Sequence, residues 1–243
     1  MTHFLKGFYK TFLLALLVHL CGLGAVNAQS QDSKGKDFWV AFPENYTGTP
    51  ALTLFIAGDV ATTGTVSIPG LGFSTNYSVT PGVVTSVALP GTAQADASNV
   101  VQNRGIHVTA QEEVSVYGLN RIQFTTDAFM ALPTDILGTE YINLGYKVSI
   151  GYSTQFVVVG TQNSTVVTIT PSVTTDGHPA GVPYNITLNQ GQTYLLGNPS
   201  INADLSGSII TSTKPVAVFG SNACTNIPVD RVFCDYIVEQ LPP

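Results

Sequence analysis

An internal repeat constrains the fold of this chain more than any other feature of its sequence. The stretch GIHVTAQEEVSVYGLN at 105–120 matches GSIITSTKPVAVFGSN at 207–222 at a constant offset of 102. A second pair, GKDFWVA at 35–41 and GTEYINL at 138–144, matches at an offset of 103, and further matches keep the same order. A colinear series of this kind indicates a duplication.

The duplication predicts two copies of about 100 residues, copy one at 35–137 and copy two at 138–243. Short apolar runs recur in both copies between glycine, proline and asparagine clusters, which is the spacing of β-hairpins. No long window after residue 28 has helical periodicity. We therefore expect an all-β protein of two tandem β-sandwich-like copies with about seven strands each. The copy boundary stays open because a repeat frame is cyclic, so the strand at 38–42 can complete its own copy or cap a neighbouring sheet.

Residues 1–28 have the pattern of a secretory signal peptide. Two lysines precede an apolar run at 12–20, and small residues that end at Ala28 form a cleavage site. A membrane anchor is the alternative, but the apolar run is shorter than the roughly 20 residues that span a bilayer. We expect cleavage after Ala28, a leader at 29–34, no membrane insertion of the mature chain, and a secreted or cell-surface location.

The charge of the mature chain argues against nucleic acid and anionic lipid as partners. The full chain has 9 basic and 15 acidic residues, and cleavage removes two lysines and no acid, which leaves a formal charge of −8. A negative surface repels phosphate backbones and acidic headgroups. Few charges with abundant threonine, serine, valine and glycine are typical of an extracellular all-β protein.

Cys224 and Cys234 are the only cysteines that remain after signal cleavage. One pair in a secreted chain, on a loop that copy one lacks, predicts a disulfide. Closing a loop of about ten residues contributes at most about 3 kcal/mol in the chain-entropy model, so the bridge is expected mainly to hold the loop in one shape. The candidate binding residues of this loop are Thr225, Asn226, Asp230 and Arg231. The alternative is that the bridge only pins a long connection.

Sequence motifs give no support for an enzyme. The chain contains no GxSxG, HExxH, P-loop or EF-hand pattern, so we predict no catalytic residue, no cofactor and no metal site. His107 lies inside an expected strand and aligns with Ile209, which favours a partly buried strand residue over a general base. His178 lies in a loop rich in glycine and proline.

Asp127 and Asp235 occupy matching positions near an aromatic residue in the two copies. A carboxylate at such a place typically fixes a turn by accepting backbone N–H groups. A calcium site formed by Asp230, Asp235 and Glu239 is the alternative, although these acids lack a defined ligand spacing.

Four N-x-S/T triplets are candidate glycosylation sites if the host modifies secreted proteins. They lie at Asn45, Asn76, Asn163 and Asn185. Such triplets also arise by chance in a chain rich in serine and threonine.

Three segments resemble the N-terminal domain of the IgG Fc-binding protein family, found in large mucus-associated animal proteins and in bacterial surface or secreted proteins. They are GKDFWVAFPEN at 35–45, GSIITSTKPVAVFGSN at 207–222 and CDYIVEQLPP at 234–243. The last is the most specific. The resemblance covers most of 35–243 and implies a secreted binding or adhesion module, and it implies that the natural chain continues past Pro243. No Fc-contact residue can be carried over to this sequence.

The sequence therefore predicts a non-enzymatic adhesion or ligand-binding module outside the cell, with a protein or glycan partner. The alternative is a structural spacer repeat in an extracellular array, with binding located elsewhere. An enzyme such as a glycoside hydrolase would need a pair of carboxylates in a cleft about 5 to 9.5 Å apart, and the sequence offers no convincing pair.

Overall fold

The computed structural model describes residues 32–243, so the expected signal peptide and the first residues of the leader lie outside the described part. Within 32–243 the chain is all-β, and its helical segments are the 3-10 turns Pro69–Leu71, Gly91–Ala93 and Thr134–Ile136. The predicted fold class, all-β and β-sandwich-like, is confirmed. The strands are β1 Gly35–Val40, β2 Phe42–Pro43, β3 Ala51–Ala57, β4 Thr62–Ile68, β5 Phe73–Val79, β6 Thr85–Leu89, β7 Gln94–Ala95, β8 Val100–Gln102, β9 Ile106–Ile122, β10 Thr125–Met130, β11 Glu140–Ile142, β12 Thr154–Gly160, β13 Thr165–Thr170, β14 Tyr184–Leu188, β15 Thr193–Asn198, β16 Ile209–Ser212, β17 Val216–Thr225 and β18 Asp235–Leu241.

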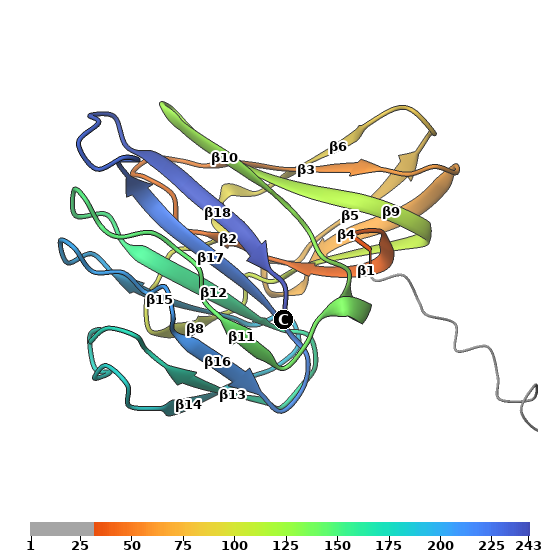
Figure 1. The fold of residues 1–243 in the computed structure, drawn as a ribbon. Coiled ribbons are helices and arrows are strands. Elements are labelled where there is room, and N and C mark those ends of the chain that lie inside the picture. The colour runs from red at the N-terminus through yellow and green to blue at the C-terminus, as the bar shows by residue number, and fades with distance from the viewer. Residues whose placement is uncertain (1–31) are drawn as a thin grey trace, which may run out of the picture. The chain divides into compact units, whose positions relative to one another are not determined.

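The long strand β9 organises the first half of the chain (Figure 1). Its first part pairs with β1 and β4, and its second part pairs with β3 and β10, in each case antiparallel. The strands β5 and β6 extend the two layers beside β4 and β3. One strand thus passes through both layers, which run in the orders β1-β9-β4-β5 and β10-β9-β3-β6.

The same network of strand pairs recurs in the second half. There β11-β16-β13-β14 forms one layer and β18-β17-β12-β15 the other. The counterpart of β9 is split into β16 and β17, because Pro215 has no N–H group and interrupts the strand, whereas Glu113 stands at the matching place in copy one. Residues Asp32–Pro243 form one compact unit, so the division of the chain at 137/138 stays a prediction.

Strand β12 is buried on both faces, unlike its counterpart β3. Phe156 and Val158 belong to the core of the second half, whereas Val157 and Val159 belong to a core shared with the first half. In β3 only every second residue is fully buried. A strand covered on both faces can be apolar at successive positions, which explains the run TQFVVVG in β12.

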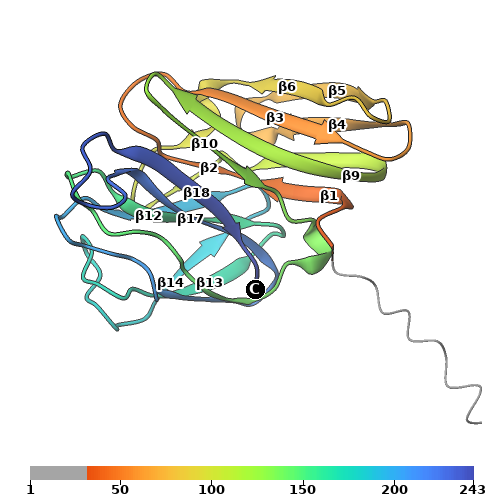
Figure 2. The same ribbon diagram turned by 45° about the horizontal axis from the view of Figure 1, so that its top comes forward.

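The two halves also meet along β10 and β18, which lie side by side (Figure 2). Asp127 accepts the N–H groups of Ala128 and, across the contact, of Val238 at 3.0 Å. In the same way Asp235 accepts the N–H group of Tyr236 and, across the contact, that of Thr126. The prediction that these carboxylates accept backbone N–H groups is thus met, and each also joins the two halves.

The repeated asparagines Asn120 and Asn222 explain one of the strongest matches in the sequence. Both are fully buried. The side chain of Asn120 donates to the carbonyl of Pro43 at 3.3 Å, and Asn222 donates to the carbonyl of Tyr146 at 2.9 Å. These carbonyls also stand at matching places, so in both halves a buried amide holds the segment that follows the first strand.

Candidate functional site

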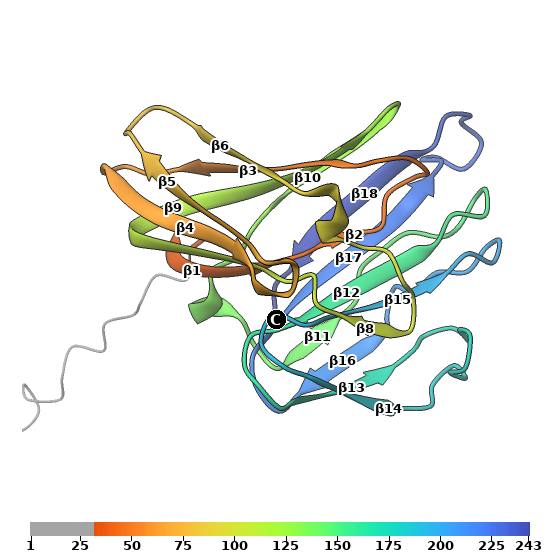
Figure 3. The same ribbon diagram turned by 180° about the vertical axis from the view of Figure 1, so that it is seen from behind.

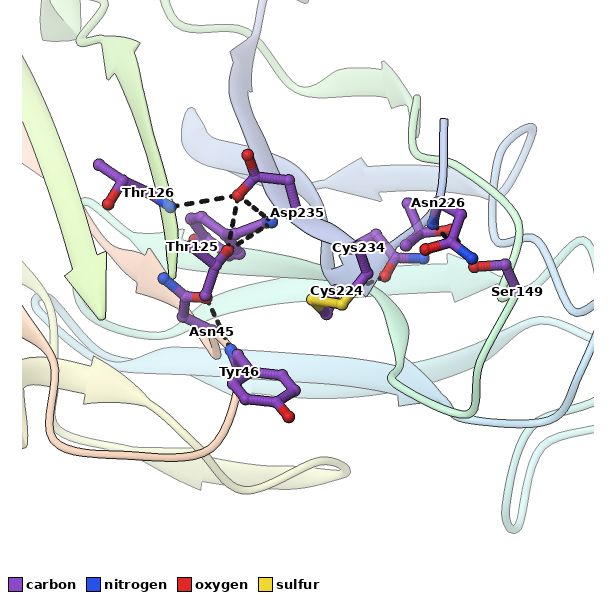
Figure 4. Close-up of a disulfide and its surroundings, with 12 residues drawn as sticks. Asn45, Tyr46, Thr125, Thr126, Ser149, Cys224, Asn226, Cys234 and Asp235 are labelled. Atoms are coloured by element: carbon purple, nitrogen blue, oxygen red, sulfur yellow. Dashed lines mark hydrogen bonds between the residues drawn. A yellow bond between two sulfur atoms is a disulfide. The ribbon is translucent and has the colours of Figure 1, made fainter. Parts of the chain in front are cut away.

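The disulfide predicted from the sequence is present. It joins Cys224 near the end of β17 to Cys234 just before β18, with a Cα–Cα distance of 5.2 Å. Cys224 is buried, while Cys234 is partly exposed. The bridge therefore closes the loop at 226–234 against the ends of both strands (Figure 4).

The four candidate binding residues of this loop do not share one surface. Thr225 and Asn226 are buried: the hydroxyl of Thr225 donates to the carbonyl of Lys147 at 2.8 Å, and the N–H of Asn226 donates to Ser149 Oγ at 2.8 Å. Asp230 and Arg231 are exposed. The first two thus attach the loop to the segment at 145–153, and Asn226 also lines the groove described below, whereas Asp230 and Arg231 are the exposed pair.

Sequence reasoning missed the exposed aromatic residues of this end. Phe124 in the β9–β10 turn is 90% exposed, and Phe233 beside the disulfide is 94% exposed. Both have positive φ, 77° and 91°, in a region that bulky side chains rarely occupy. Strained backbone of this kind gathers at functional sites. The signal in the sequence was two phenylalanines placed between strands instead of inside them.

Phe124 and Phe233 border an apolar groove of about 480 Å³. Its walls come from the segment after β2, the β9–β10 turn, the segment at 145–153 and the disulfide loop. The lining residues are Tyr46, Phe124, Thr125, Ile150, Cys224, Asn226, Val232, Phe233 and Cys234. Because the lining is apolar apart from a few groups, the groove can take an apolar side chain and offers little hydrogen bonding to a polar one.

Buried hydrogen bonds from both halves hold the groove in shape. Asn45 donates to Asn120 Oδ1 at 3.2 Å, and its own Oδ1 accepts the N–H of Tyr46 at 2.6 Å, which orients the backbone at that wall. On the other side Asp235 accepts from the hydroxyl of Thr125 at 2.7 Å, next to Phe124 (Figure 4). The walls are therefore preorganised, which lowers the entropic cost of binding.

The four candidate glycosylation sites differ in exposure: one is buried and three are exposed. Asn45 is only 3% exposed and its amide nitrogen donates to Asn120, so a glycan cannot be accommodated there. Asn76, Asn163 and Asn185 are exposed and stay candidates.

No group of three or more His, Cys, Asp or Glu side chains within residues 32–243 is arranged to hold a metal ion. The acids of the calcium alternative thus form no such cluster, and one oxygen of Asp235 is occupied by protein donors. None of the helical turns in the described part has the length and hydropathy of a membrane span.

A polar cluster on β1 and β9 lies outside the groove. His107 stacks on Trp39 with ring centroids 4.2 Å apart, and its Nε2 lies 2.7 Å from a carboxylate oxygen of Asp37. Thr134 donates to the other oxygen. Burial alone would raise the pKa of Asp37, but the hydrogen bonds of His107 and Thr134 and the charge of His107 together lower it. The cluster connects β1 to β9 and to the 3-10 turn at Thr134.

We expect the interactions of Asp37 to make part of the free energy of unfolding depend on pH. Because the folded pKa of Asp37 is lowered, its contribution is present above the ordinary pKa of an aspartate, about 3.9, and is lost as the pH falls through the folded value. Asp37→Asn should cost less than about 1 kcal/mol near pH 7, since the group is half-exposed and screened. Urea unfolding near pH 7 and near pH 3 checks this, and a difference between the two proteins that grows in acid would contradict it.

Comparison with known proteins gives these observations a family context. Residues 127–243 match the family model described as IgGFc binding protein. The resemblance to the IgGFc-binding protein family is confirmed. The IgGFc-binding protein of Homo sapiens is 30% identical to this chain over 218 residues, which are 86% of this chain and 4% of the human protein. No solved structure matches the chain.

The part that matches the IgGFc-binding family model contains β18, the disulfide and Phe233, whereas Tyr46 and Phe124 lie before it. The match to the human IgGFc-binding protein extends over most of the chain. The chain spans only a small part of the length of that relative.

Proposed function

We propose that this chain is an extracellular, non-enzymatic binding module that contacts a protein partner through the apolar groove beside the disulfide. The observation that carries the proposal is the pair Phe124 and Phe233, both about fully exposed at the rim of one groove. Exposed apolar patches on a soluble protein mark interaction sites, and aromatic residues dominate binding energy at protein interfaces. The signal peptide predicted at 1–28 and the resemblance to the IgGFc-binding protein family support an extracellular location.

A protein fits the groove better than a glycan does. Sugars are recognised largely through hydrogen bonds, and most of the lining side chains offer none. The name of the human relative indicates the Fc part of IgG as the first partner to test, although this chain corresponds to 4% of that protein. Asp230 and Arg231 are exposed on the same loop and are proposed as the polar rim of the contact.

The double variant Phe124→Ser/Phe233→Ser is expected to weaken binding of the full chain to immobilised human IgG Fc at least about 30-fold, because losing even one aromatic hot spot costs about 2 kcal/mol or more. Val182→Ser removes an apolar residue that is 51% exposed in a loop elsewhere, and should change the affinity less than about 2-fold. Equal loss in both variants would remove the groove from the contact. A wild-type chain that does not bind Fc would exclude that partner.

The disulfide should matter through the shape of the loop. Cys224→Ser/Cys234→Ser leaves Phe233 in the chain but frees its backbone, so binding should weaken while the fold persists. Unchanged binding would mean that the bridge only pins the connection.

The spacer hypothesis is supported by a different observation, the recurrence of one strand network in two halves that share a core. Under this alternative the chain only sets the distance between its neighbours in an array. The variant Phe124→Ser/Phe233→Ser would then have no effect on any binding activity of the intact protein.

A further inference from the structure

Strand β15 in the second half is an edge strand that another part of the chain covers. Ser98 forms an isolated parallel bridge with Leu195, and the N–H of Asn99 donates to the carbonyl of Leu195 at 2.8 Å. The N–H of Gly197 donates to Ser98 Oγ at 2.9 Å. The segment that contains β8 thus runs beside β15 and uses its outward backbone groups (Figure 3). We call residues 98–105 the arm.

The arm also places a side chain between β14 and β15. Asn99 Oδ1 accepts from the hydroxyl of Tyr194 at 2.6 Å and lies 2.8 Å from Nε2 of His178. The ring of His178 stacks on Tyr184 with centroids 3.5 Å apart. The docking therefore combines backbone hydrogen bonds to an edge strand with a polar pocket for a single side chain, which is the mode by which proteins bind extended peptides.

The first half has the same edge without an arm. Ser86 of β6 pairs with Phe55 as Leu195 of β15 pairs with Val157, so β6 is the counterpart of β15. The backbone groups of Leu195 and Gly197 point away from β12, and by the same register those of Ser86 and Ala88 point away from β3. Among the described residues β6 pairs only with β3. Ser86 and Ala88 are exposed, whereas their counterparts in β15 are buried.

The chemistry of the β6 edge suits a ligand that is an extended chain. Charged side chains and proline usually protect an exposed edge strand from pairing with another chain. The strand β6, with the sequence TSVAL, has neither. A groove of about 330 Å³ runs between β5 and β6, at the place where Asn99 lies in the second half. Its lining residues are Phe73, Thr75, Asn76, Tyr77, Thr85, Ser86, Val87 and Ala88.

We propose that the outer edge of β6 binds an extended segment of a partner protein, parallel to β6, as the arm binds β15. The backbone of Ser86 and Ala88 supplies the hydrogen bonds, and alternate uncharged side chains of the ligand enter the groove between β5 and β6. The site shares no residue with the groove at the disulfide and does not depend on the function proposed for it.

The probe is a synthetic peptide with the sequence of the arm and its flanks, residues 95–106, titrated against the full chain. Bound peptide should protect the amide of Ala88 from hydrogen exchange. Ala88→Pro removes an N–H that points away from β3, and proline is tolerated at such an edge position, so the fold should persist while peptide affinity falls at least about 10-fold. Unchanged exchange of the β3 amides confirms that the variant is folded.

A peptide N-methylated at the residue that corresponds to Asn99 is the matched control, because it lacks the donor to the carbonyl of Ser86. It should bind at least about 10-fold more weakly to the wild-type chain. No binding at millimolar peptide, equal binding by Ala88→Pro, or protection confined to Gly197 on β15 would each overturn the proposal. A concentration-dependent dimer that Ala88→Pro abolishes would also overturn it, since the ligand of β6 would then be a second copy.

Discussion

Replacing Phe219 by alanine is expected to lower the free energy of unfolding by about 3–5 kcal/mol, the range for a large aromatic side chain removed from a close-packed core. Phe219 on β17 is fully buried and meets Phe129 of β10 with ring centroids 5.1 Å apart. Its ring thus lies in the core that the two halves share. Urea unfolding monitored by circular dichroism measures the loss.

The duplication supplies a matched control for this variant. Tyr117 on β9 stands at the place of Phe219 in copy one but is 42% exposed. Tyr117→Ala should therefore cost less, about 1 kcal/mol, because close to half of the surface of Tyr117 is already in contact with water and no closed core cavity is left behind. Similar losses in the two variants would contradict a shared core, and so would an unfolding curve in which only half of the signal responds to Phe219→Ala.

The second large effect is expected at Asn120. Asn120→Ala removes a fully buried amide that donates to the carbonyl of Pro43 and to Gln94 Oε1 and accepts from Asn45. Several buried polar groups lose their partner together, and each unsatisfied group costs about 1–3 kcal/mol. We expect a loss of about 3 kcal/mol in the free energy of unfolding.

The effect of Asn120→Ala should also reach the groove. Asn45 and Tyr46 lose their support, so binding through the groove should weaken even under conditions where the variant is fully folded. Asn76→Ala, at an exposed asparagine on β5, should change stability by less than about 0.5 kcal/mol and leave binding through the groove beside the disulfide unchanged. Equal free energies of unfolding for Asn120→Ala and Asn76→Ala would show that the buried hydrogen-bond network contributes nothing to stability.

The two copies illustrate how far the pattern of the sequence predicts this fold. The matches around Asn120 and Asn222 could be read from the sequence because the two halves repeat them, but the buried hydrogen bonds behind the matches join distant segments and only the structure shows them. The apolar runs at 106–109 and 114–117 are separated by polar residues and predict two strands, which the structure joins in β9. Without a proline between them, nothing interrupts that strand.

The candidate site could be predicted only in part. The cysteine pair indicated a closed loop at the right place, and the loop does line the groove. Polar residues near a loop are commonly exposed, which favours Thr225 and Asn226 as binding residues, but β17 extends to Thr225 and both residues are buried. The exposure of a residue at a strand end depends on which segment covers it, here the segment at 145–153.

The sequence by itself determined the features that repeat along the chain, namely the strand content, the internal repeat and the alternation of apolar residues. It also determined one feature that does not repeat, the cysteine pair that closes a loop in the second half. The repeating features depend on interactions between near neighbours or between copies, so they leave periodic signals. The tertiary structure alone decided which faces are covered. It buried Phe219 but exposed Tyr117, it brought Tyr46, Phe124 and Phe233 to one groove, and it covered the edge of β15 but not that of β6. Contacts between distant segments decide such matters, and they leave no period in the sequence.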